Sequence, residues 1–398
     1  MTATITYTSL QLLKHSRVKI PLLRFHSSNG KLVTCELKHR SIISLRGPDV
    51  IPFLQGLVTN DMRYFEEQNR HPSLYSLMLD QRGRVTNDLL FYNVPNSKLL
   101  CDTQNATSTS RTTHDRSVLC ECDTTTVQSL LKRLKAYTLR RSIELRDCST
   151  EFSVQSAFYP VKASQEPNDS HTEVIIPQSD STTAEGVSAS VVCVVSDPRL
   201  KALGCRVLTR KDNSVDLEQV FDVEVERGGI EQYWRHLKIF GVGEGIQDLP
   251  PGKCTPLESN GDYLNGVSFH KGCYIGQELT ARTHHTGIVR KRLMPVVAQC
   301  PPGKNLDNVL ANSDIYAGSK DVRHDLSGEA KDNAGKRVGK FRTGIGRYGL
   351  ALLRFEDALT AEKLWVVSAK SEIVLLGTQK PVWWSDLEVR GFQPWEET

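Results

Sequence analysis

The feature that most constrains the fold of this chain is a change of hydrophobic pattern near residue 290. From Lys291 onward, short apolar runs with a period of two alternate with clusters of Gly, Asn, Asp and Lys. These runs are LMPVVA, GKRVGKF, GLALLRF, KLWVVSA and EIVLLG. Several short strands at this spacing are typical of a small β-barrel or sandwich. We therefore predict a domain boundary near residue 290, with a C-terminal β-domain over residues 291–398.

The chain before this boundary mixes helical and strand patterns. The runs LYSLML and NDLLFYNV, between Tyr75 and Tyr92, predict two strands joined by a turn at residues 80–83. Residues 127–140 have a helical pattern that places four apolar side chains on one face, namely Val127, Leu130, Leu131 and Leu134. Further strands are predicted at residues 191–195 and 205–208, followed by a helix around Tyr233, Trp234 and Leu237. These elements predict a sheet with helices packed on it.

Length and composition set the broad class of the protein. The 398 residues correspond to about two or three domains, and 39% hydrophobic with 24% charged residues is typical of an ordinary globular chain. No apolar run approaches the roughly 20 residues that a membrane-spanning helix needs, so an integral membrane protein is excluded and no membrane partner is expected. Residues 163–190 are polar and rich in Ser and Thr, which predicts a surface insertion.

The net charge of +4 comes from the N-terminal segment. Residues 1–35 hold five basic residues and no acidic one, so 45 of the 50 basic residues remain against 46 acidic residues in the rest of the chain. A nearly neutral body gives no electrostatic case for direct nucleic-acid binding. The segment has the composition of a mitochondrial transit peptide, with a mature chain expected to start near Ser27; a merely disordered basic terminus is the alternative.

Cys273 lies in the most unusual segment of the chain, NGVSFHKGCYIGQELTAR at residues 265–282. It lies between Gly272 and Gly276, beside Lys271 and just before a predicted helix start at Gln277. Adjacent cations and a helix N-terminus are expected to lower the pKa of the thiol, which favours a nucleophile or a metal ligand. An inert loop cysteine is the alternative, and the ten scattered cysteines of the chain indicate free thiols in a reducing compartment.

The sequence does not supply a complete metal site around this cysteine. No C-x-x-C pair occurs, although four ligands are normally needed for zinc or an iron–sulfur cluster. Cys120 and Cys122 are a weak metal signal, with buried thiols as the alternative. His284 and His285, taken as neighbours on a strand, are expected to point to opposite faces. The missing ligands therefore point to a partner protein, and the absence of G-x-S-x-G argues against a serine hydrolase.

Three carboxylates are candidate polar anchors for a small molecule. Asp80 lies in the predicted hairpin turn, Asp88 in the strand that follows, and Glu258 in the run PLESN. Carboxylates at strand ends are more often solvated, so this second interpretation stays open.

The run PLESN at 256–260 and the block NGVSFHKGCYIGQELTARTHHTGIVRKRLMPV at 265–296 closely resemble the YgfZ-type branch of the aminomethyltransferase (glycine cleavage T-protein) family. The block K-G-C-Y-x-G-Q-E, from Lys271 to Glu278, is the most specific part. The resemblance extends from RGPDVIPFLQGLVTND at 46–61 through GKFRTGIGRYGLALL at 339–353 to Val382-Trp383-Trp384. It does not include residues 1–35 and is weakest over 151–190.

The resemblance implies a fold of three parts around a central cavity. A folate-binding, aminomethyltransferase-like region of two α+β lobes corresponds to residues 36–290, and a C-terminal β-barrel to residues 291–398. The transit peptide and disordered N-terminus then account for residues 1–35. The cavity is expected to be the place where Asp80, Asp88 and Glu258 would anchor a cofactor, with tetrahydrofolate as the candidate.

The resemblance also implies a role in the mitochondrial matrix as an iron–sulfur cluster assembly factor. Such a factor acts late, with A-type carriers, to convert [2Fe–2S] clusters into the [4Fe–4S] centres of client enzymes, which are aconitase-like, lipoate-forming and radical enzymes, with a link to heme biosynthesis. The motif cysteine of the family falls on Cys273, which is expected to be the ligand of a [2Fe–2S] cluster shared with a partner, or a redox thiol. The other motif residues are Lys271, Gly272, Tyr274, Gly276, Gln277, Glu278 and Arg282.

Aminomethyl transfer, the activity of the T-protein itself, is the alternative function. The transferase turn reads N-x-x-G-G-I-x-D-D, whereas DQRGRVTND here places Asn87 where the first paired carboxylate stands, and an amide cannot take up a proton. The transferase segment L-R-x-E-x-G corresponds to residues 237–242, where Phe240 replaces the glutamate that holds the pterin. Both departures argue against an active transferase. A third hypothesis is indirect support of tRNA modification, through a cluster-dependent modifying enzyme.

Overall fold

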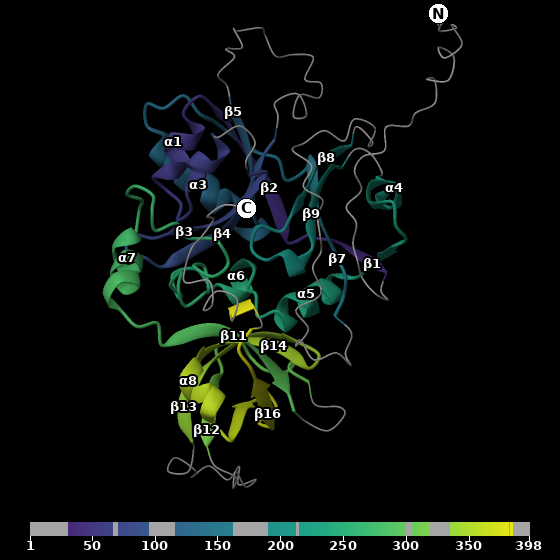
Figure 1. The fold of residues 1–398 in the computed structure, drawn as a ribbon, viewed down its shortest axis with the longest axis vertical. Coiled ribbons are helices and arrows are strands. Elements are labelled where there is room, and N and C mark those ends of the chain that lie inside the picture. Colours follow the sequence, from purple (N-terminus) through teal and green to yellow (C-terminus); the bar gives the residue numbers. More distant parts are fainter. Residues whose placement is uncertain are drawn as a thin grey trace, which may run out of the picture.

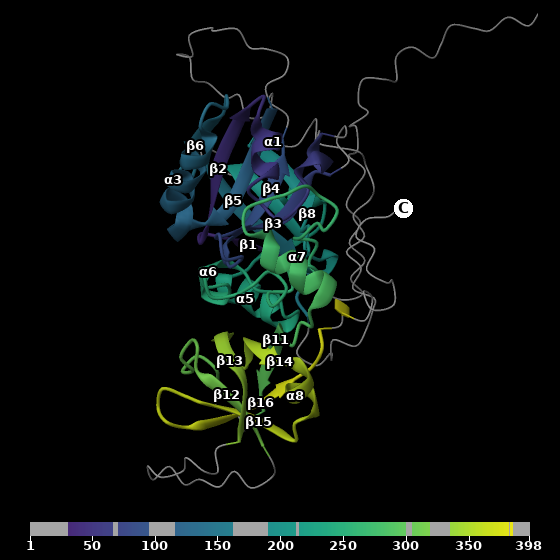
Figure 2. The same cartoon turned by 90° about the vertical axis from the view of Figure 1, so that its left-hand side faces the viewer.

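The computed structural model describes residues 31–66, 71–94, 116–161, 190–211, 215–299, 305–318, 335–381 and 383–384. Within these ranges the chain forms two five-stranded sheets and a closed six-stranded barrel. Figure 1 shows the two sheets above and the barrel below, and Figure 2 shows the same division from the side. The predicted α+β class, with two lobes and a C-terminal barrel, is confirmed.

The first sheet has the order β3-β4-β5-β2-β6. Its strands are β2 (Arg40–Gly47), β3 (Ser73–Leu79), β4 (Val85–Asn93), β5 (Arg116–Asp123) and β6 (Glu144–Asp147). The predicted hairpin is present as β3 and β4, with a turn over residues 80–83 closed by a hydrogen bond from the Gly83 amide to the Asp80 carbonyl. The helices α1 (Val50–Gln55) and α3 (Val127–Thr138) share a hydrophobic core with this sheet. The four predicted apolar positions of α3 are its buried residues.

The second sheet has the order β10-β1-β7-β9-β8. Its strands are β1 (Leu32–Glu36), β7 (Phe152–Phe158), β8 (Val191–Ser196), β9 (Cys205–Arg210) and β10 (Val225–Arg227). The expectation that disorder extends to residue 35 is wrong, because β1 is buried between β7 and β10. Leu32, Val33 and Cys35 decide this, because they are buried in the sheet although the segment before them is basic. Residues 1–30, with the predicted transit peptide and Ser27, lie outside the described residues.

The C-terminal barrel closes through the order β11-β14-β13-β12-β15-β16. Its strands are β11 (Lys291–Ala298), β12 (Asp314–Gly318), β13 (Lys336–Ile345), β14 (Tyr348–Arg354), β15 (Lys363–Val367) and β16 (Ile373–Thr378), and α8 (Phe355–Thr360) follows β14. Of the two architectures predicted from the period-two runs, the structure has the closed barrel. All strand pairs in it are antiparallel.

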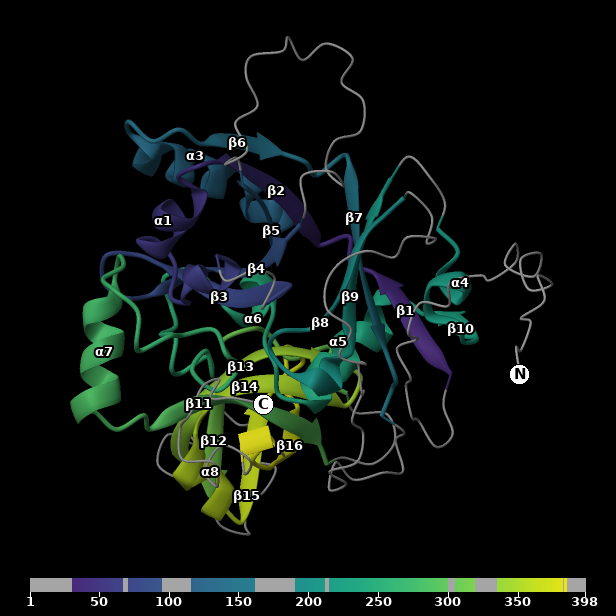
Figure 3. The ribbon, with the colours of Figure 1, turned by 45° about the horizontal axis from the view of Figure 1, so that its top comes forward.

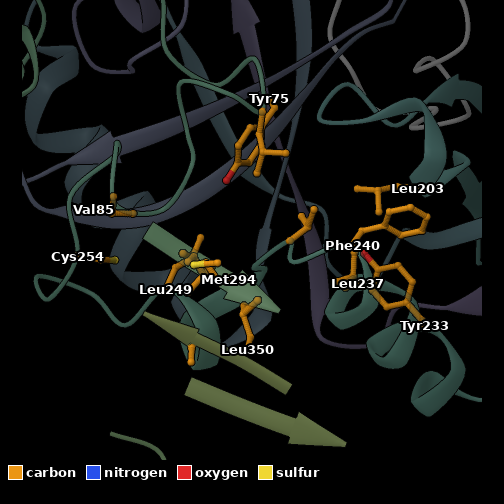
Figure 4. Close-up of a cluster of buried hydrophobic side chains, with 14 of the residues drawn as sticks. Tyr75, Val85, Leu203, Tyr233, Leu237, Phe240, Leu249, Cys254, Met294 and Leu350 are labelled. Atoms are coloured by element: carbon orange, nitrogen blue, oxygen red, sulfur yellow. The ribbon is translucent and has the colours of Figure 1, made fainter. Parts of the chain in front are cut away.

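In the described part of the chain, four further helices lie between β9 and β11. They are α4 (Leu217–Phe221), α5 (Ile230–Ile239), α6 (Gly245–Asp248) and α7 (Gln277–Thr286). Figure 3 shows α7 at the periphery, α5 between the second sheet and the barrel strands, and α6 between β4 of the first sheet and the barrel. One hydrophobic core extends from the second sheet into the barrel. In Figure 4, Leu249, Met294 and Leu350 lie beside the barrel strands, while Tyr233, Leu237 and Phe240 come from α5 and its C-terminus.

The C-terminal tryptophans help to join the barrel to the upper region. The Trp383 indole donates a hydrogen bond to the Phe240 carbonyl at 2.8 Å, and the Arg292 guanidinium lies 3.9 Å from the centre of the Tyr263 ring. The predicted polar insertion at 163–190 lies outside the described residues except for Ser190, as does Val382. Among the described helices, none is long and apolar enough to cross a membrane.

Candidate functional site

Cys273 differs from the other described cysteines in its exposure. Its thiol is exposed, that of Cys193 is partly buried, and the others that the structure describes are buried, namely Cys35, Cys120, Cys122, Cys148, Cys205 and Cys254. Burial raises the pKa of Cys148 to about 11 and that of Cys122 to about 12, so these groups remain neutral thiols at neutral pH. Within the described residues, Cys273 is therefore the cysteine that a partner can reach.

Lys271 anchors the loop that carries Cys273. Its ammonium donates hydrogen bonds to the carbonyls of Val58 and Asn60, at 2.6 and 2.7 Å. Both carbonyls belong to the segment that leads from α1 to the first sheet. The Lys271 side chain therefore points into the protein, where two backbone carbonyls hold its ammonium.

Backbone hydrogen bonds join the same two segments on either side of Lys271. The Ile275 amide donates to the Gly56 carbonyl at 3.1 Å, and the Ser268 amide donates to the Thr59 carbonyl at 3.0 Å. The Thr59 hydroxyl in turn donates to the Gly266 carbonyl at 2.6 Å. Residues 266–275 are thus fixed at several points along residues 56–60, and the loop presents Cys273 from a rigid support.

Burial has a clear electrostatic effect on Lys271. Desolvation lowers the pKa of this ammonium to about 7, and the nearby carboxylate of Asp61 only partly opposes the shift. The Tyr274 ring lies 4.9 Å from Nζ and covers it. A neutral amine still has two N–H donors, which match the two carbonyl acceptors.

Gly276 connects the cysteine loop to the predicted hairpin turn. It precedes α7 with φ of +78°, and a Cβ atom there would lie 2.3 Å from the Asp80 carbonyl oxygen and 3.2 Å from Gly83 Cα. Only glycine fits this close approach of two backbones. Gly272 differs, because a Cβ at that position would meet open space. The structure therefore brings the hairpin turn against the motif, and it gives a steric reason for one of the two glycines.

The remaining motif residues belong to the start of α7. The Tyr274 amide donates to Oε1 of Gln277 at 3.2 Å, which closes the turn before the helix. Glu278 is exposed in the first turn, where the helix dipole favours an acidic residue, and Arg282 is exposed one turn later. The helix begins at Gln277, as predicted.

His284 and His285 also lie on α7, so their assignment to a strand is wrong. Polar residues around them hide the helical pattern in the sequence. Their ring centres lie 5.1 Å apart, and the His284 ring stacks on Phe269 at 3.6 Å. Within the described residues, no group of three or more His, Cys, Asp or Glu side chains could hold a metal ion. Cys273 can therefore act as a nucleophile, or as one ligand of a centre whose other ligands belong to another molecule.

Cys120 and Cys122 lie in the hydrophobic core beside the first sheet. Both are on β5 and have almost no exposed surface. Burial raises the pKa of both thiols. Their placement matches the interpretation as buried thiols.

The three candidate cofactor carboxylates each interact with neighbouring groups of the protein. Asp80 accepts the backbone amides of Arg82 and Arg84, both at 2.9 Å, and so stabilises its own turn. Glu258 accepts the Thr255 hydroxyl at 3.2 Å. Asp88 is buried elsewhere and pairs with Arg40 at 2.9 Å. Each carboxylate thus has an intramolecular partner, and a role of these three residues in anchoring a pterin stays a prediction.

A buried ion network lies between the two sheets, and sequence reasoning missed most of it. Arg40 of β2 donates to Glu121 of β5 at 2.7 Å, and Tyr233 of α5 donates to Glu244 at 2.7 Å. Arg206 of β9 pairs with Glu244 and lies 3.8 Å from Glu121. The network is completed by Asp88, Tyr92, Asp197 and Arg199. These side chains occupy the interior where the two lobes meet.

The arginines of this network keep Glu244 ionised. Burial would raise the pKa of Glu244, but Arg206, Arg199 and Arg40 outweigh it and hold the pKa well below its usual range. A signal was present in the sequence, because Glu121 and Arg206 each interrupt an apolar strand run. That signal shows a buried charge but cannot show which partner neutralises it.

The two departures from the transferase pattern also have structural roles. The Asn87 amide donates to the Thr126 hydroxyl at 3.1 Å. Phe240 ends α5 and is buried in the core. A surface pocket of about 460 Å³ is lined by Glu36, Lys38, His39, Gly228, Ile230 and Trp234. His39 Nε2 lies 2.9 Å from Oε1 of Glu244, so the pocket borders the buried ion network.

Comparison with known proteins identifies the family. Residues 290–386 match the CAF17 C-terminal β-barrel domain. The fold resembles a solved glycine cleavage system aminomethyltransferase T from Bartonella henselae, with a TM-score of 0.59, 12% identity, and coverage of 89% of this chain and 87% of that one. At this identity the likeness concerns the fold alone.

Curated relatives match nearly the whole chain. The mouse protein "Iron-sulfur cluster assembly factor IBA57, mitochondrial" is 34% identical over 91% of this chain and 88% of its own length. The human protein of the same name is 32% identical over 87% and 84%, and a Mycosarcoma maydis homologue is 31% identical over 90% and 86%. These names agree with the predicted location in the mitochondrial matrix. The chain therefore belongs to the IBA57 family.

Proposed function

We propose that this protein is a mitochondrial iron–sulfur cluster assembly factor that acts late, together with A-type carriers, in the maturation of [4Fe–4S] proteins. The role in cluster assembly follows the names of its relatives. One observation supports the finer role: Cys273 is the exposed thiol among the described cysteines, and it lies on a loop fixed by Lys271. The cluster is the cargo of this protein rather than its resident cofactor.

The chemistry of the site favours a shared ligand. A cluster held by four thiolates needs more ligands than Cys273 provides, and the described residues around it contain no second exposed cysteine. A carrier that holds a [2Fe–2S] cluster through its own thiolates could accept Cys273 as a further ligand. The rigid loop lowers the entropy that is lost when this contact forms. A redox role of the same thiol is the variant of this proposal.

The experiment that tests the late role uses cells that lack their own IBA57 relative. We expect the wild-type chain to restore a [4Fe–4S] enzyme such as aconitase, while a [2Fe–2S] ferredoxin stays loaded with or without it. Cys273→Ser should fail to restore aconitase, and Cys193→Ser, which changes a partly buried thiol, should succeed. Equal loss of both cluster types in the deficient cells would assign the protein to an early step and contradict the proposal.

Folate-dependent aminomethyl transfer is the rival function, and the geometry gives it little support. Asp88 is neutralised by Arg40, and Asn87 already donates to Thr126. We expect calorimetric titration of the full chain with tetrahydrofolate to give no saturable heat. Tight binding would revive the transferase. Indirect support of tRNA modification needs no separate site, because it would follow from the maturation of a cluster-dependent modifying enzyme.

A further inference from the structure

We propose that the turn between α3 and β6, with Leu139 at its tip, is a docking site for the surface of an anionic lipid bilayer. We call residues 138–141, together with the exposed basic side chains of α3, the basic tip. The proposal rests on three independent features of this tip: its backbone conformation, the exposure of its leucine, and its unpaired positive charge.

Leu139 has a backbone conformation that normally requires glycine. Its φ and ψ are +48° and −110°, and the Arg141 amide donates to the Thr138 carbonyl at 2.9 Å. These values are close to the first central position of a type II′ turn, where glycine is usual. A leucine here costs conformational energy, and such strain is generally retained where the residue serves a function.

The Leu139 side chain is not buried in the fold. It is 87% exposed, the highest value among the exposed large hydrophobic residues that the structure describes. The others of this kind are Ile230, Ile288, Leu310 and Val367, and none lies in the basic tip. A strained and fully presented leucine therefore projects from the edge of the first sheet, next to its edge strand β6. Figure 3 shows α3 and β6 at the periphery of the molecule.

The charged residues that adjoin Leu139 along the chain have one sign, and the Asp49 carboxylate lies beside the turn, where it accepts a hydrogen bond from the Ser142 amide at 2.8 Å. Between Asp123 and Glu144 the chain has five basic residues and no acidic one. Arg133 donates to the Thr86 hydroxyl and the Leu79 carbonyl, so it is used within the protein. The exposed side chains of Lys132, Lys135 and Arg140 have no ion pair within the described part of the chain, and Arg141 lies 5.6 Å from the Phe53 ring.

These features fit a lipid surface better than a protein partner. A stable protein interface needs an apolar core of several residues and is enriched in aromatic anchors. The basic tip offers one leucine and several cations on a protruding turn. A bilayer surface accepts this combination, because one apolar side chain enters the headgroup boundary while Lys and Arg contact anionic headgroups. Contact with a bilayer surface does not require a membrane-spanning helix, and none is present among the described residues.

The test is cosedimentation of the full chain with vesicles of phosphatidylglycerol and phosphatidylcholine in equal parts, compared with pure phosphatidylcholine. We expect binding to the anionic vesicles, weakening as salt is added. Leu139→Gly should lower the affinity for the vesicles about tenfold, since it removes the leucine side chain that would be buried in the bilayer. Lys135→Gln and Arg140→Gln should each lower it about fivefold. Leu310→Gly, which removes an exposed leucine from the barrel, is the matched control and should bind like wild type.

The design separates binding from folding. Leu139→Gly relieves the backbone strain, so its thermal unfolding temperature should equal or exceed that of wild type, and weaker binding cannot come from unfolding. The basic N-terminal segment is common to all variants and cancels in the comparison. Failure of wild type to bind anionic vesicles, or equal binding of Leu139→Gly, would overturn the proposal. If an acidic protein cross-links to the tip and vesicles do not bind, the site belongs to a protein partner and the lipid proposal is wrong.

Discussion

The Lys271 ammonium donates a hydrogen bond to the carbonyl oxygen of Val58 at 2.6 Å. Lys271 lies two residues before the exposed Cys273. Lys271 and Val58 are 213 positions apart in the chain, yet their contact fixes the loop that presents the Cys273 thiol. The lysine of the motif thus attaches the loop to the protein, while the cysteine is exposed to solvent.

Lys271 should make the stability of the protein depend on pH in one direction. Its pKa is about 7 in the folded protein and near the ordinary value of 10.5 in the unfolded chain. Between these values the unfolded state binds more protons, so the free energy of unfolding of wild type, relative to Lys271→Met, should rise as the pH increases from about 7 to about 10. Urea unfolding of both proteins across this range measures the effect. A constant difference would show that the ammonium is not buried as described.

Gly276 and Gly272 form a matched pair for a steric test. Gly276→Ala should lower the free energy of unfolding by at least about 2 kcal/mol, because it combines a left-handed backbone with a contact of 2.3 Å to the Asp80 carbonyl oxygen. Gly272→Ala should stay within about 0.5 kcal/mol, since its Cβ meets open space. Chemical denaturation of the two variants measures both values. Equal effects at the two glycines would contradict the packing of the hairpin turn against the motif.

Arg40 should be essential to the buried ion network. Arg40→Met leaves Asp88 and Glu121 without their main cation, and removal of one partner of a buried pair costs about 3 to 5 kcal/mol. Lys336→Met, which breaks the exposed pair with Asp357, should cost less than about 1 kcal/mol. Thermal or urea unfolding compares the two. A small loss for Arg40→Met would indicate that water or another cation replaces the guanidinium.

Thiol labelling should single out Cys273 among the described cysteines. A brief reaction of the native protein with iodoacetamide, followed by mass spectrometry of its peptides, should modify Cys273 and leave Cys120, Cys122 and Cys205 unmodified. The buried thiols should react only after unfolding. Rapid native labelling of Cys122 would show that β5 opens to solvent and would weaken the case for Cys273 as the reachable thiol.

Local patterns predicted those elements whose apolar residues repeat along one segment. The buried face of α3, the β3–β4 hairpin and the barrel strands are of this kind, because period and turn chemistry decide them within a few residues. The strand β1 was not predicted, because a basic and polar segment precedes Leu32 and masks the apolar residues of the strand. The histidines of α7 were misplaced because their helix has few apolar residues.

The sequence predicted the reactive residue of the site, but it did not predict the contacts that hold the loop of this residue in place. Cys273 stands out by its glycines and by the motif around it. Its exposure, and the burial of the Lys271 side chain, depend on contacts with Val58 and Asn60 more than 200 positions away in the chain. The same limit applies to Arg40, whose partners Asp88 and Glu121 come from other strands. Pairings between distant segments leave no pattern in either segment alone.

The central claim is that Cys273 supplies a ligand to a cluster shared with a carrier. The most direct measurement mixes the full chain anaerobically with an A-type carrier that holds a [2Fe–2S] cluster, and follows complex size together with cluster absorbance. We predict a heterocomplex that bears the cluster with wild type and Cys193→Ser, and loss of the cluster from the complex with Cys273→Ser. An equally loaded complex with Cys273→Ser would contradict the claim, and Cys273 would then act in docking or in a later reductive step.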